Sequence, residues 1–390
     1  MDYYIQKYSE FILSLTDVKN AEFPDSAFLV SEHEQISSGH SISGVFCHTA
    51  KSINENSLNR ICDFIIYENS KNRRPCIAVE DTTGIYSVIK ERLNQLPNSK
   101  SIRKSDPNWV VHATNFRNGK AIIQDGKIKS QKRLIDEKYF SEHQLGYKYN
   151  NEPVDYLDHI NFAINDSIWP ETVVSSNQSG SIGDFDEPYN PGIRFYINAH
   201  DLIKSGLVIR TGAPFLKVVG ELSFNDYLNY PISIELFDEQ IWTPRTFTVA
   251  TNNVFMEIFL KIPEKFHNVK YVASRIPGVP NESDMSLGAN CQVFAYNLLR
   301  ALGLNPPTLR SSELWSESEF TTTVDDFKEL DIMLYNKSQE SYGAHLGIYV
   351  GHGIVYHLSK DNGIPKFEKH LDLLKQSKYS RFIGAKRVNY

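Results

Sequence analysis

The feature that most constrains the fold is a short apolar hairpin, AHLGIYVGHGIVYH, at residues 344–357. Two apolar runs flank a Gly-His-Gly loop at 351–353, and a three-residue loop that contains glycine is a common connection between antiparallel strands. Side chains alternate between the two faces of a strand, so the loop length decides which residues share a face. The hairpin therefore determines where its two terminal histidines point.

The predicted register brings His345 and His357 to one face of the hairpin. If Val350 pairs with Ile354, Gly347 lies opposite His357 and His345 becomes a diagonal neighbour of His357. Diagonal neighbours on one face are close enough for long side chains to interact. A loop of two or four residues would put the two imidazoles on opposite faces. The spacing therefore predicts that one imidazole orients the other.

A candidate nucleophile precedes the hairpin in the segment GANCQVFAYNLLRALG, residues 288–303. Asn290 is a favoured N-cap and Gly303 a favoured C-terminal stop, which together predict a helix that begins at Cys291. Apolar residues recur at helical spacing, so one face packs inward and the thiol faces a neighbouring sheet. A helix N-terminus and a nearby imidazole both lower the pKa of a thiol. The sequence thus predicts a Cys291 thiolate near neutral pH.

These three side chains suit nucleophilic catalysis at a carbonyl group. Cys291 attacks the carbonyl, His345 takes the thiol proton and returns it to the leaving amine, and His357 holds His345 in the required tautomer. The free backbone N–H of Cys291 helps to stabilise the oxyanion. The alternative is structural, because a single cysteine on an apolar helix face is usually a small buried hydrophobic residue.

Residues 285–390 resemble the NlpC-type endopeptidases of the papain-like clan. GANCQVFAYNLLRALGL stands where that family has its nucleophile helix, AHLGIYVGHGIVYHLS resembles its histidine hairpin, and FKELDIMLY and YSRFIGAKRV resemble strands that follow. The resemblance implies that Cys291, His345 and His357 are catalytic. It also implies an amide substrate, either peptidoglycan stem peptides after delivery to a periplasm or a protein or small amide in the cytosol. The family's Asp-Cys-Ser-Gly is replaced here by Asn-Cys-Gln-Val.

A second resemblance concerns residues 106–274, where the sequence favours strands. The predicted strand runs are WVVHAT, IRFYI, GLVIRT, FLKVVGEL, TFTVAT and VFMEIFLKI. The His-x-Thr of the first run, with PGIRFYINAHDLIKSGLVIRTGAP and VFMEIFLKIPEKFHNVKYV, resembles NAD-using ADP-ribosyltransferase-like domains of the DarT-like and RNA phosphotransferase-like branches.

This resemblance implies NAD as a cofactor and a protein or nucleic acid as the acceptor of ADP-ribose. His112 and Thr114 would bind the nicotinamide ribose side, Arg133 would contact phosphates or the substrate, and Glu257 would be catalytic and steer ribosyl transfer. A carboxylate beside a developing oxocarbenium stabilises it. Two alternatives stay open: an inactive scaffold of the same kind, and an unrelated β-rich domain in which Glu257 is a polar-face residue of a strand.

Length and composition predict a soluble α+β protein with several cores. The 390 residues exceed what one core usually holds, and 41% hydrophobic and 23% charged residues are typical of globular proteins. The first segment is mixed α/β, with helices expected at 4–15 and 85–96, and a polar, proline-bounded stretch at 97–107 is typical of a linker. We expect a mixed α/β N-terminal segment, a β-rich ADP-ribosyltransferase-like domain and a papain-like NlpC-type domain, at residues 1–105, 106–274 and 275–390.

Charge and cysteine content argue against several other classes. The net charge of -6 disfavours a nucleic-acid binder with an overall basic field, although residues 99–138 carry ten Lys or Arg against four acids. That stretch suits NAD phosphates, nucleic acid or a solvated basic face. Four cysteines without CxxC spacing predict free thiols and no metal site. No signal peptide or membrane-spanning run is found, so we expect cytoplasmic synthesis, no membrane partner, and export only by a specialised secretion machine.

The combined prediction is a Cys-His-His amide hydrolase fused to an NAD-dependent ADP-ribosyltransferase. By analogy with such families, the arrangement suggests a bacterial toxin or injected effector. Two alternatives remain: a non-catalytic binding protein that retains these folds, and an enzyme in which only the ADP-ribosyltransferase is active.

Overall fold

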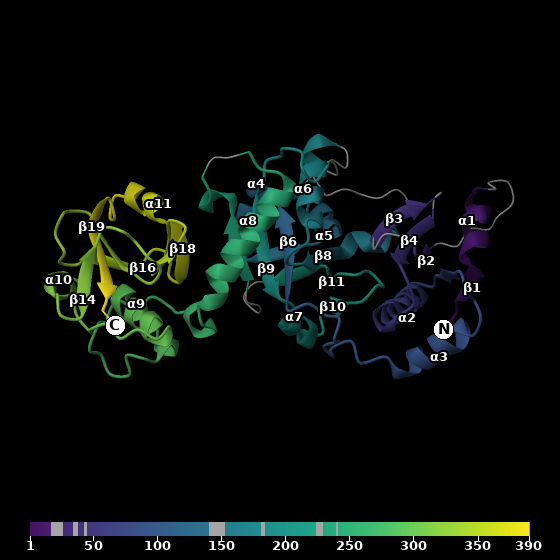
Figure 1. Cartoon of the computed structure of the whole chain (residues 1–390), viewed down its shortest axis with the longest axis horizontal. Coiled ribbons are helices and arrows are strands. Elements are labelled where there is room, and N and C mark those ends of the chain that lie inside the picture. Colours follow the sequence, from purple (N-terminus) through teal and green to yellow (C-terminus); the bar gives the residue numbers. More distant parts are fainter. Residues whose placement is uncertain are drawn as a thin grey trace. The chain divides into compact units, whose positions relative to one another are not determined.

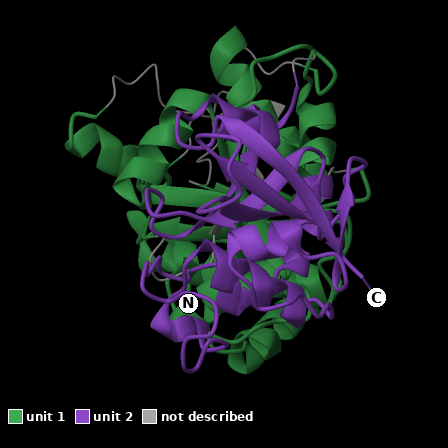
Figure 2. Cartoon of the chain, turned by 90° about the vertical axis from the view of Figure 1, so that its left-hand side faces the viewer, with its two compact units in different colours: residues 1–234, 239–252 green, residues 235–238, 253–390 purple. Residues whose placement is uncertain are grey.

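The computed structural model describes most of the chain, namely residues 1–16, 26–33, 38–42, 45–139, 153–180, 184–223, 229–238 and 241–389. Within these residues the strands form one five-stranded sheet, two six-stranded sheets and a two-stranded ribbon (Figure 1). Contacts divide the chain into two compact units, which Figure 2 colours separately: residues 1–234 with 239–252, and residues 235–238 with 253–390. The mixture of helices with parallel and antiparallel strands confirms the predicted α+β class.

The first sheet has the strand order β1-β5-β2-β4-β3, in which β3 is an antiparallel edge strand and the others run parallel. Its strands are β1 (Tyr4–Lys7), β2 (Ser26–Val30), β3 (Ser38–Ile42), β4 (Val45–Ala50) and β5 (Cys76–Val79). The accompanying helices are α1 (Tyr8–Thr16), α2 (Glu55–Ser70) and α3 (Ile85–Gln95). The helix predicted at 85–96 is confirmed. The helix predicted at 4–15 is wrong in its first turn, because Tyr4–Lys7 pairs with β5 instead.

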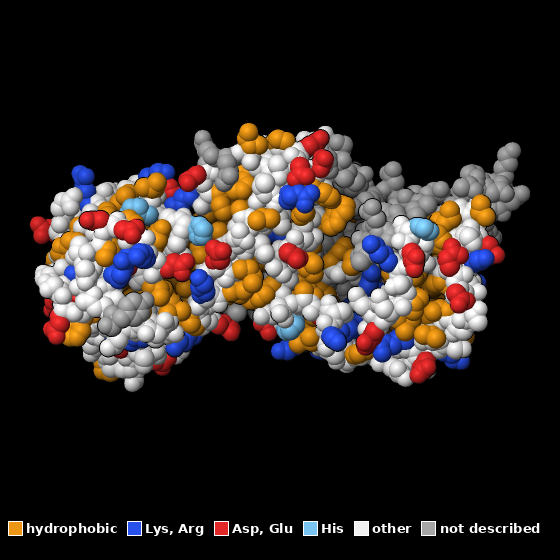
Figure 3. Space-filling model, viewed as in Figure 1, with side chains coloured by type: hydrophobic (Ala, Val, Ile, Leu, Met, Phe, Trp, Pro, Cys, Tyr) orange, Lys and Arg blue, Asp and Glu red, His pale blue; other side chains and the backbone are white. Residues whose placement is uncertain are grey.

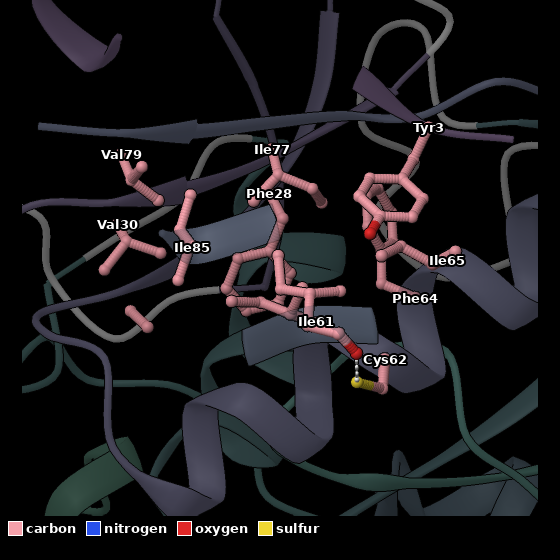
Figure 4. Close-up of a cluster of buried hydrophobic side chains, with 12 residues drawn as sticks. Tyr3, Phe28, Val30, Ile61, Cys62, Phe64, Ile65, Ile77, Val79 and Ile85 are labelled. Carbon is pink, nitrogen blue, oxygen red and sulfur yellow. Dashed lines mark hydrogen bonds between the residues drawn. The ribbon is translucent and has the colours of Figure 1, made fainter. Parts of the chain in front are cut away.

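The core of this sheet is apolar on the face covered by α2 and α3. Figure 4 shows Phe28 and Ile77 from the strands directed toward Ile61 and Phe64 of α2. Cys62 lies in the same cluster, where its thiol donates to the carbonyl oxygen of Ile89 over 3.9 Å. Burial raises the pKa of Cys62 to about 12, so this thiol stays protonated and packs as an apolar group.

The second sheet is antiparallel, with the order β10-β11-β8-β6-β9-β13. Its strands are β6 (Trp109–Thr114), β8 (His159–Ile164), β9 (Ile193–Asn198), β10 (Val208–Ile209), β11 (Leu216–Val219) and β13 (Asn229–Ser233), and the separate ribbon pairs β7 (Lys127–Lys129) with β12 (Glu221–Ser223). The helices of this segment are α4 (Phe116–Asp125), α5 (Gln131–Asp136), α6 (Trp169–Ser179), α7 (Ala199–Ser205) and α8 (Pro244–Glu257), with 3-10 turns at Val154–Asp158 and Ile234–Leu236.

Two of the strands predicted in this segment are wrong. TFTVAT and most of VFMEIFLKI belong to α8 and to the 3-10 turn Phe259–Lys261 that follows it. β-branched and aromatic residues favour strands only weakly, and tertiary context overrides that preference. Phe247, Thr251, Val254 and Ile258 are all buried at helical spacing, so a helix puts this apolar stripe on one side where a strand would split it between two faces.

Buried ion pairs connect α2 of the first sheet with the segment that follows. Arg103 bonds both carboxylate oxygens of Asp63, at 2.5 and 2.9 Å, and Arg210 bonds both oxygens of Asp106 at 2.8 Å. Arg73 joins Asp155 at 2.7 Å. The stretch 97–107 contains no helix or strand, as predicted for a linker, yet these contacts fix it against α2. The two sheets therefore belong to one compact unit, and the two boundaries between the three predicted domains stay a prediction.

The second unit holds the third sheet, an antiparallel sheet of order β14-β19-β15-β16-β17-β18. Its strands are β14 (Thr321–Val324), β15 (Ile332–Asn336), β16 (His345–Gly351), β17 (Ile354–Leu358), β18 (Pro365–Lys369) and β19 (Arg381–Val388). The helices are α9 (Cys291–Ala301), α10 (Ser311–Ser316) and α11 (His370–Lys375), with 3-10 turns at Glu264–Phe266 and Met285–Leu287. α9 packs against β16 and β17 (Figure 1).

We predict that Asp63→Ala lowers the free energy of unfolding of the first unit by about 3–5 kcal/mol, because it leaves the buried Arg103 charge without its partner. Urea unfolding followed by circular dichroism measures this change. Asp136→Ala is the matched control, since the exposed Lys132–Asp136 pair contributes about 0–1 kcal/mol. Equal effects of the two substitutions would contradict the role given to the Asp63–Arg103 pair.

Candidate active site

The helix α9 begins at Cys291, as the sequence predicts. Asn290 has extended backbone angles, φ -84° and ψ 178°, and its side-chain oxygen accepts the Val293 N–H at 2.8 Å. This cap satisfies one backbone donor and leaves the N–H groups of Cys291 and Gln292 at the open end of the helix. Behind the thiol, apolar side chains of α9 are buried against the sheet. The cysteine therefore lies where a helix N-terminus meets β16.

The loop before Cys291 is held by a buried arginine that sequence reasoning missed. Arg275 donates from Nε to the Gly288 carbonyl oxygen and from its terminal nitrogen to the Asn281 carbonyl oxygen, both at 2.7 Å. Its own carbonyl oxygen accepts the N–H of Asn290, the residue that caps α9. A rigid loop here fixes the entry to the helix and hence the position of Cys291. The only sequence signal was the Pro- and Gly-rich break that begins at Ile276.

The hairpin has the predicted strand register but a different turn. Ile348 pairs with Tyr356 and Tyr349 with Val355, as expected. Beyond them the pairing shifts, so that Gly351 rather than Val350 lies opposite Ile354. His352 and Gly353 both have positive φ, 52° and 72°, which suits a two-residue hairpin turn. The bulge at Val350 absorbs the extra residue, so the tighter turn leaves the face on which the histidines lie unchanged.

His345 and His357 contact each other through their ring nitrogens. Nε2 of His345 lies 2.9 Å from Nδ1 of His357, and the rings are nearly perpendicular, at 85°. The two residues are 8% and 1% exposed, so the hydrogen bond lies in a low-dielectric environment where it is strong. Gly347 makes room for the pair, because a Cβ at that position would stand 3.1 Å from the Cβ of His357. The structure thus brings together the two predicted imidazoles.

A carboxylate that sequence reasoning missed extends this pair. Nε2 of His357 lies 3.2 Å from Oε2 of Glu368, and Gln376 donates from Nε2 to the other oxygen of Glu368 at 2.6 Å. Glu368 lies on β18, two residues beyond Lys366, which pairs with His357 in the ladder. Residues two apart share a face, so Glu368 would have been found if the register of β18 had been known.

Tyr379 covers the first imidazole. Its ring stacks on His345 with the centroids 4.5 Å apart and the planes at 22°. Burial and the neighbouring Cys291 raise the pKa of Tyr379, a hydrogen bond with Ser359 opposes them, and the net pKa is about 12. The stacked ring limits rotation of His345, so its imidazole is held from one face by packing and from Nε2 by His357.

The sulfur of Cys291 lies close to the backbone of β16. The N–H groups of Leu346, Gln292 and Cys291 itself stabilise a thiolate there, but burial dominates and raises the pKa of Cys291 above its ordinary value. Leu346 directly follows His345, so the thiol lies at the end of the strand that carries the imidazole. The expected lowering of the thiol pKa is therefore wrong, because desolvation outweighs the helix N-terminus.

Burial acts on the imidazole in the opposite direction. The pKa of His345 lies well below its ordinary value of 6.5, first because of burial and then because of His357 and Lys378. A raised thiol pKa and a lowered imidazole pKa together favour a neutral thiol beside a neutral ring at neutral pH. These directions oppose the preformed thiolate that the sequence predicted.

The residues predicted to bind NAD lie on three different elements of the structure. His112 and Thr114 lie on β6, where Nδ1 of His112 is 3.3 Å from the Asn161 carbonyl oxygen. Arg133 lies on α5 and pairs with Glu137 at 3.3 Å. Glu257 ends α8 in the second unit, more than half exposed, and its carboxylate lies 3.2 Å from His352. Glu257 is therefore a helix-end residue, and the predicted strand that would carry a catalytic glutamate is wrong.

Three of these residues belong to the first unit and Glu257 belongs to the second, so NAD binding stays a prediction. The basic stretch 99–138 is partly neutralised by carboxylates, as in the pairs Lys127–Glu221 and Lys129–Glu137. Basic and acidic side chains are also interspersed on the face shown in Figure 3. Nucleic acid as a partner likewise stays a prediction.

Two further features of the described residues concern metal ions and membranes. The described part of the chain contains no group of three or more His, Cys, Asp or Glu side chains arranged to hold a metal ion. In the same residues, no helix has the length and apolar character needed to cross a membrane.

Comparisons with known proteins return structural similarities alone. No protein-family model and no curated protein matches the sequence. An NlpC/P60 family protein from Bacillus cereus ATCC 10987 is similar at 15% identity, over 52% of this chain and 55% of that one, with a TM-score of 0.25. The NlpC/p60 domain of peptidoglycan hydrolase SagA is similar at 18% identity, over 35% and 97%, with a TM-score of 0.24. NlpC2 from Trichomonas vaginalis is similar at 11% identity, over 50% and 62%, with a TM-score of 0.25.

The chain spans about half the length of the Bacillus protein. At these TM-scores and identities the similarities carry no argument about fold or function.

We predict that alkylation of Cys291 by iodoacetamide accelerates with pH and is half-maximal above pH 9.0, the ordinary thiol value, because the pKa of this thiol is raised. Mass spectrometry of the peptide that contains Cys291, sampled between pH 5 and 10, measures the rate. An inflection below pH 7 would instead indicate a preformed thiolate–imidazolium pair and would contradict the neutral resting site.

Proposed function

We propose that the second unit is a papain-like cysteine hydrolase that cleaves amide bonds. The observation that carries this proposal is the hydrogen-bonded pair His345–His357 beside the N-terminus of α9, where the thiol of Cys291 lies next to the backbone of Leu346. A nucleophile, a base and a group that orients the base are the parts that acyl transfer requires.

The first half-reaction forms a thioester. As Sγ of Cys291 bonds to the substrate carbonyl carbon, its proton passes to the nitrogen of His345 that is not bonded to His357. The carbonyl oxygen becomes an oxyanion, which the N–H groups at the start of α9 stabilise. When the C–N bond breaks, the imidazolium returns the proton to the leaving nitrogen, and the amine departs.

The second half-reaction restores the enzyme. His345 takes a proton from water, the resulting hydroxide adds to the thioester carbonyl, and the C–S bond breaks with return of the proton to sulfur. Each proton is taken up and released by one imidazole, so the cycle uses no cofactor. His357 keeps the ring of His345 in one orientation through both halves.

The resemblance to NlpC-type endopeptidases supports peptidoglycan stem peptides as the amide substrate, and a role as a toxin or effector delivered to a periplasm. A protein or small amide is the alternative in the cytosol. The non-catalytic alternative keeps the fold as a binding module, and it is disfavoured by the orientation of two buried imidazoles beside one thiol, which packing alone does not require.

We predict that Cys291→Ala abolishes the release of new amino groups from purified muropeptides, with a loss of at least about a thousandfold. Casein and a small amide, tested in parallel, distinguish a stem-peptide substrate from a protein or small-amide substrate. Cys47→Ala is the matched control, since Cys47 is fully buried in the first unit. Full activity of Cys291→Ala would exclude the proposed reaction.

His345→Ala should slow alkylation of Cys291 at neutral pH, because the thiol loses its proton acceptor. Cys47, Cys62 and Cys76 are fully buried and should react more slowly than Cys291 in the folded wild type. Labelling with iodoacetamide followed by peptide mapping measures all four thiols at once. Equal rates at the four positions would show that Cys291 is not activated.

NAD use remains a separate prediction and has a direct test. Wild type, His112→Ala and Glu257→Ala are incubated with NAD and candidate protein or nucleic-acid acceptors, and released nicotinamide is measured. The ADP-ribosyltransferase hypothesis expects turnover that both substitutions reduce. NAD turnover that is absent or insensitive to both would leave the first unit as a scaffold.

A further inference from the structure

Three hydrogen bonds join Gln376, Glu368, His357 and His345 in a relay. We propose that Glu368 is a positioning residue that sets the tautomer of both imidazoles, so that Nδ1 of His345 carries the lone pair which accepts the thiol proton of Cys291. This inference rests on the proposed function for its catalytic meaning, whereas the tautomers themselves can be measured without it.

The donor and acceptor roles are set first at the carboxylate of Glu368. Burial raises the pKa of Glu368, but the hydrogen bond from His357 and the nearby Lys366 outweigh this and hold the pKa below its ordinary value. Glu368 is therefore ionised at neutral pH and accepts hydrogen bonds through both oxygens. Oε1 accepts a hydrogen bond from the amide N–H of Gln376, and Oε2 accepts one from the N–H at Nε2 of His357. The hydrogen of His357 is thereby fixed on Nε2.

The tautomer of His345 follows from that of His357. The relay requires a neutral His357, whose hydrogen is on Nε2 and whose lone pair on Nδ1 accepts from Nε2 of His345 at 2.9 Å. A neutral His345 with its hydrogen on Nε2 then has its lone pair on Nδ1. The lowered pKa of His345 keeps that ring neutral. Nδ1 is thus a base before the substrate arrives, and no rearrangement of hydrogens is needed during attack.

One short turn contacts both Glu368 and His345. Gln376 follows α11 directly, and its backbone carbonyl oxygen accepts the N–H of Tyr379. The same turn therefore supplies the amide that fixes Glu368 and the ring that stacks on His345. Glu368 and Gln376 thus act on the tautomer while Tyr379 acts on the orientation of the ring, and both effects converge on one imidazole.

A structural role for Glu368 makes a different prediction. If the carboxylate only balances charge or fills space, an isosteric amide at 368 leaves the histidine hydrogens where they are. The relay predicts an inversion instead. If Gln376 keeps its orientation and still donates to position 368, the amide oxygen of the substituted side chain faces Gln376 and its NH₂ faces His357. Nε2 of His357 then becomes an acceptor, and the hydrogens of both rings shift to Nδ1.

The experiment compares wild type with Glu368→Gln in protein labelled with ¹⁵N-histidine. Two-bond ¹H–¹⁵N correlation spectra report which ring nitrogen carries hydrogen, and His345→Asn and His357→Asn variants assign the signals. We expect hydrogen on Nε2 of both rings in wild type and on Nδ1 of both rings in Glu368→Gln. Hydrolysis and alkylation of Cys291 should fall about a hundredfold, as expected when a base is held in the wrong tautomer.

The double substitution Glu368→Gln with Gln376→Glu should restore the wild-type donor and acceptor roles at His357. The carboxylate now lies at 376 and accepts the amide N–H of position 368, so the amide oxygen turns back toward His357. We expect wild-type tautomers, although the carboxylate and the amide have exchanged places. The hydrolysis rate should be at least about tenfold higher than that of Glu368→Gln. Glu340→Gln is the matched control, because it makes the same chemical change at an exposed position of the same unit.

The outcomes separate this inference from the proposed function. Wild-type tautomers in Glu368→Gln, or no recovery in the double variant, would overturn the role of Glu368. Inverted tautomers with unchanged alkylation of Cys291 would also overturn it, because the relay would then not reach the thiol. The expected tautomers in a wild type that hydrolyses no amide would leave the relay intact and would instead contradict the proposed function.

Discussion

The structure of the candidate site depends on the register of one antiparallel sheet. β16, β17 and β18 contribute His345, His357 and Glu368, three side chains that point to the same face only because pairing fixes which residues lie opposite. A shift of one residue in either ladder would move an imidazole or the carboxylate to the other face. The bulge at Val350 shows how closely this register is maintained, since it compensates for a tighter turn than the loop sequence suggests.

Desolvation decides how such a site works. The same burial that strengthens the hydrogen bonds among the buried polar groups raises the pKa of the thiol and lowers that of His345. A helix N-terminus would favour a thiolate–imidazolium pair. The burial that orients the two side chains opposes this charged pair. In the proposed mechanism a neutral site transfers the proton only at the moment of attack, so the position of one hydrogen on His345 controls that step.

The first unit follows a different principle, in which buried ion pairs fix two sheets to one another. Asp63 and Asp106 each take both hydrogen bonds of one arginine, and a stretch of polar sequence that looks like a flexible linker is fixed by these contacts. The cations of residues 99–138 are accounted for partly in this way, so a cluster of positive charge in the sequence does not become an unopposed positive surface. Arginine pairs of this kind make the unit sensitive to the loss of one partner.

The sequence by itself determined the local features of the candidate site. Asn290 and Gly303 defined the helix that starts at Cys291, and alternation in the hairpin placed His345 and His357 on one face, because caps and strand periodicity depend on neighbours a few residues away. Only the tertiary structure decided the rest. Glu368 required the register of β18, Arg275 required the fold of the loop before α9, and α8 became a helix despite its β-branched residues because its apolar stripe had to be buried on one side. Burial by distant segments also set the pKa of the thiol, a property that no local pattern in the sequence contains.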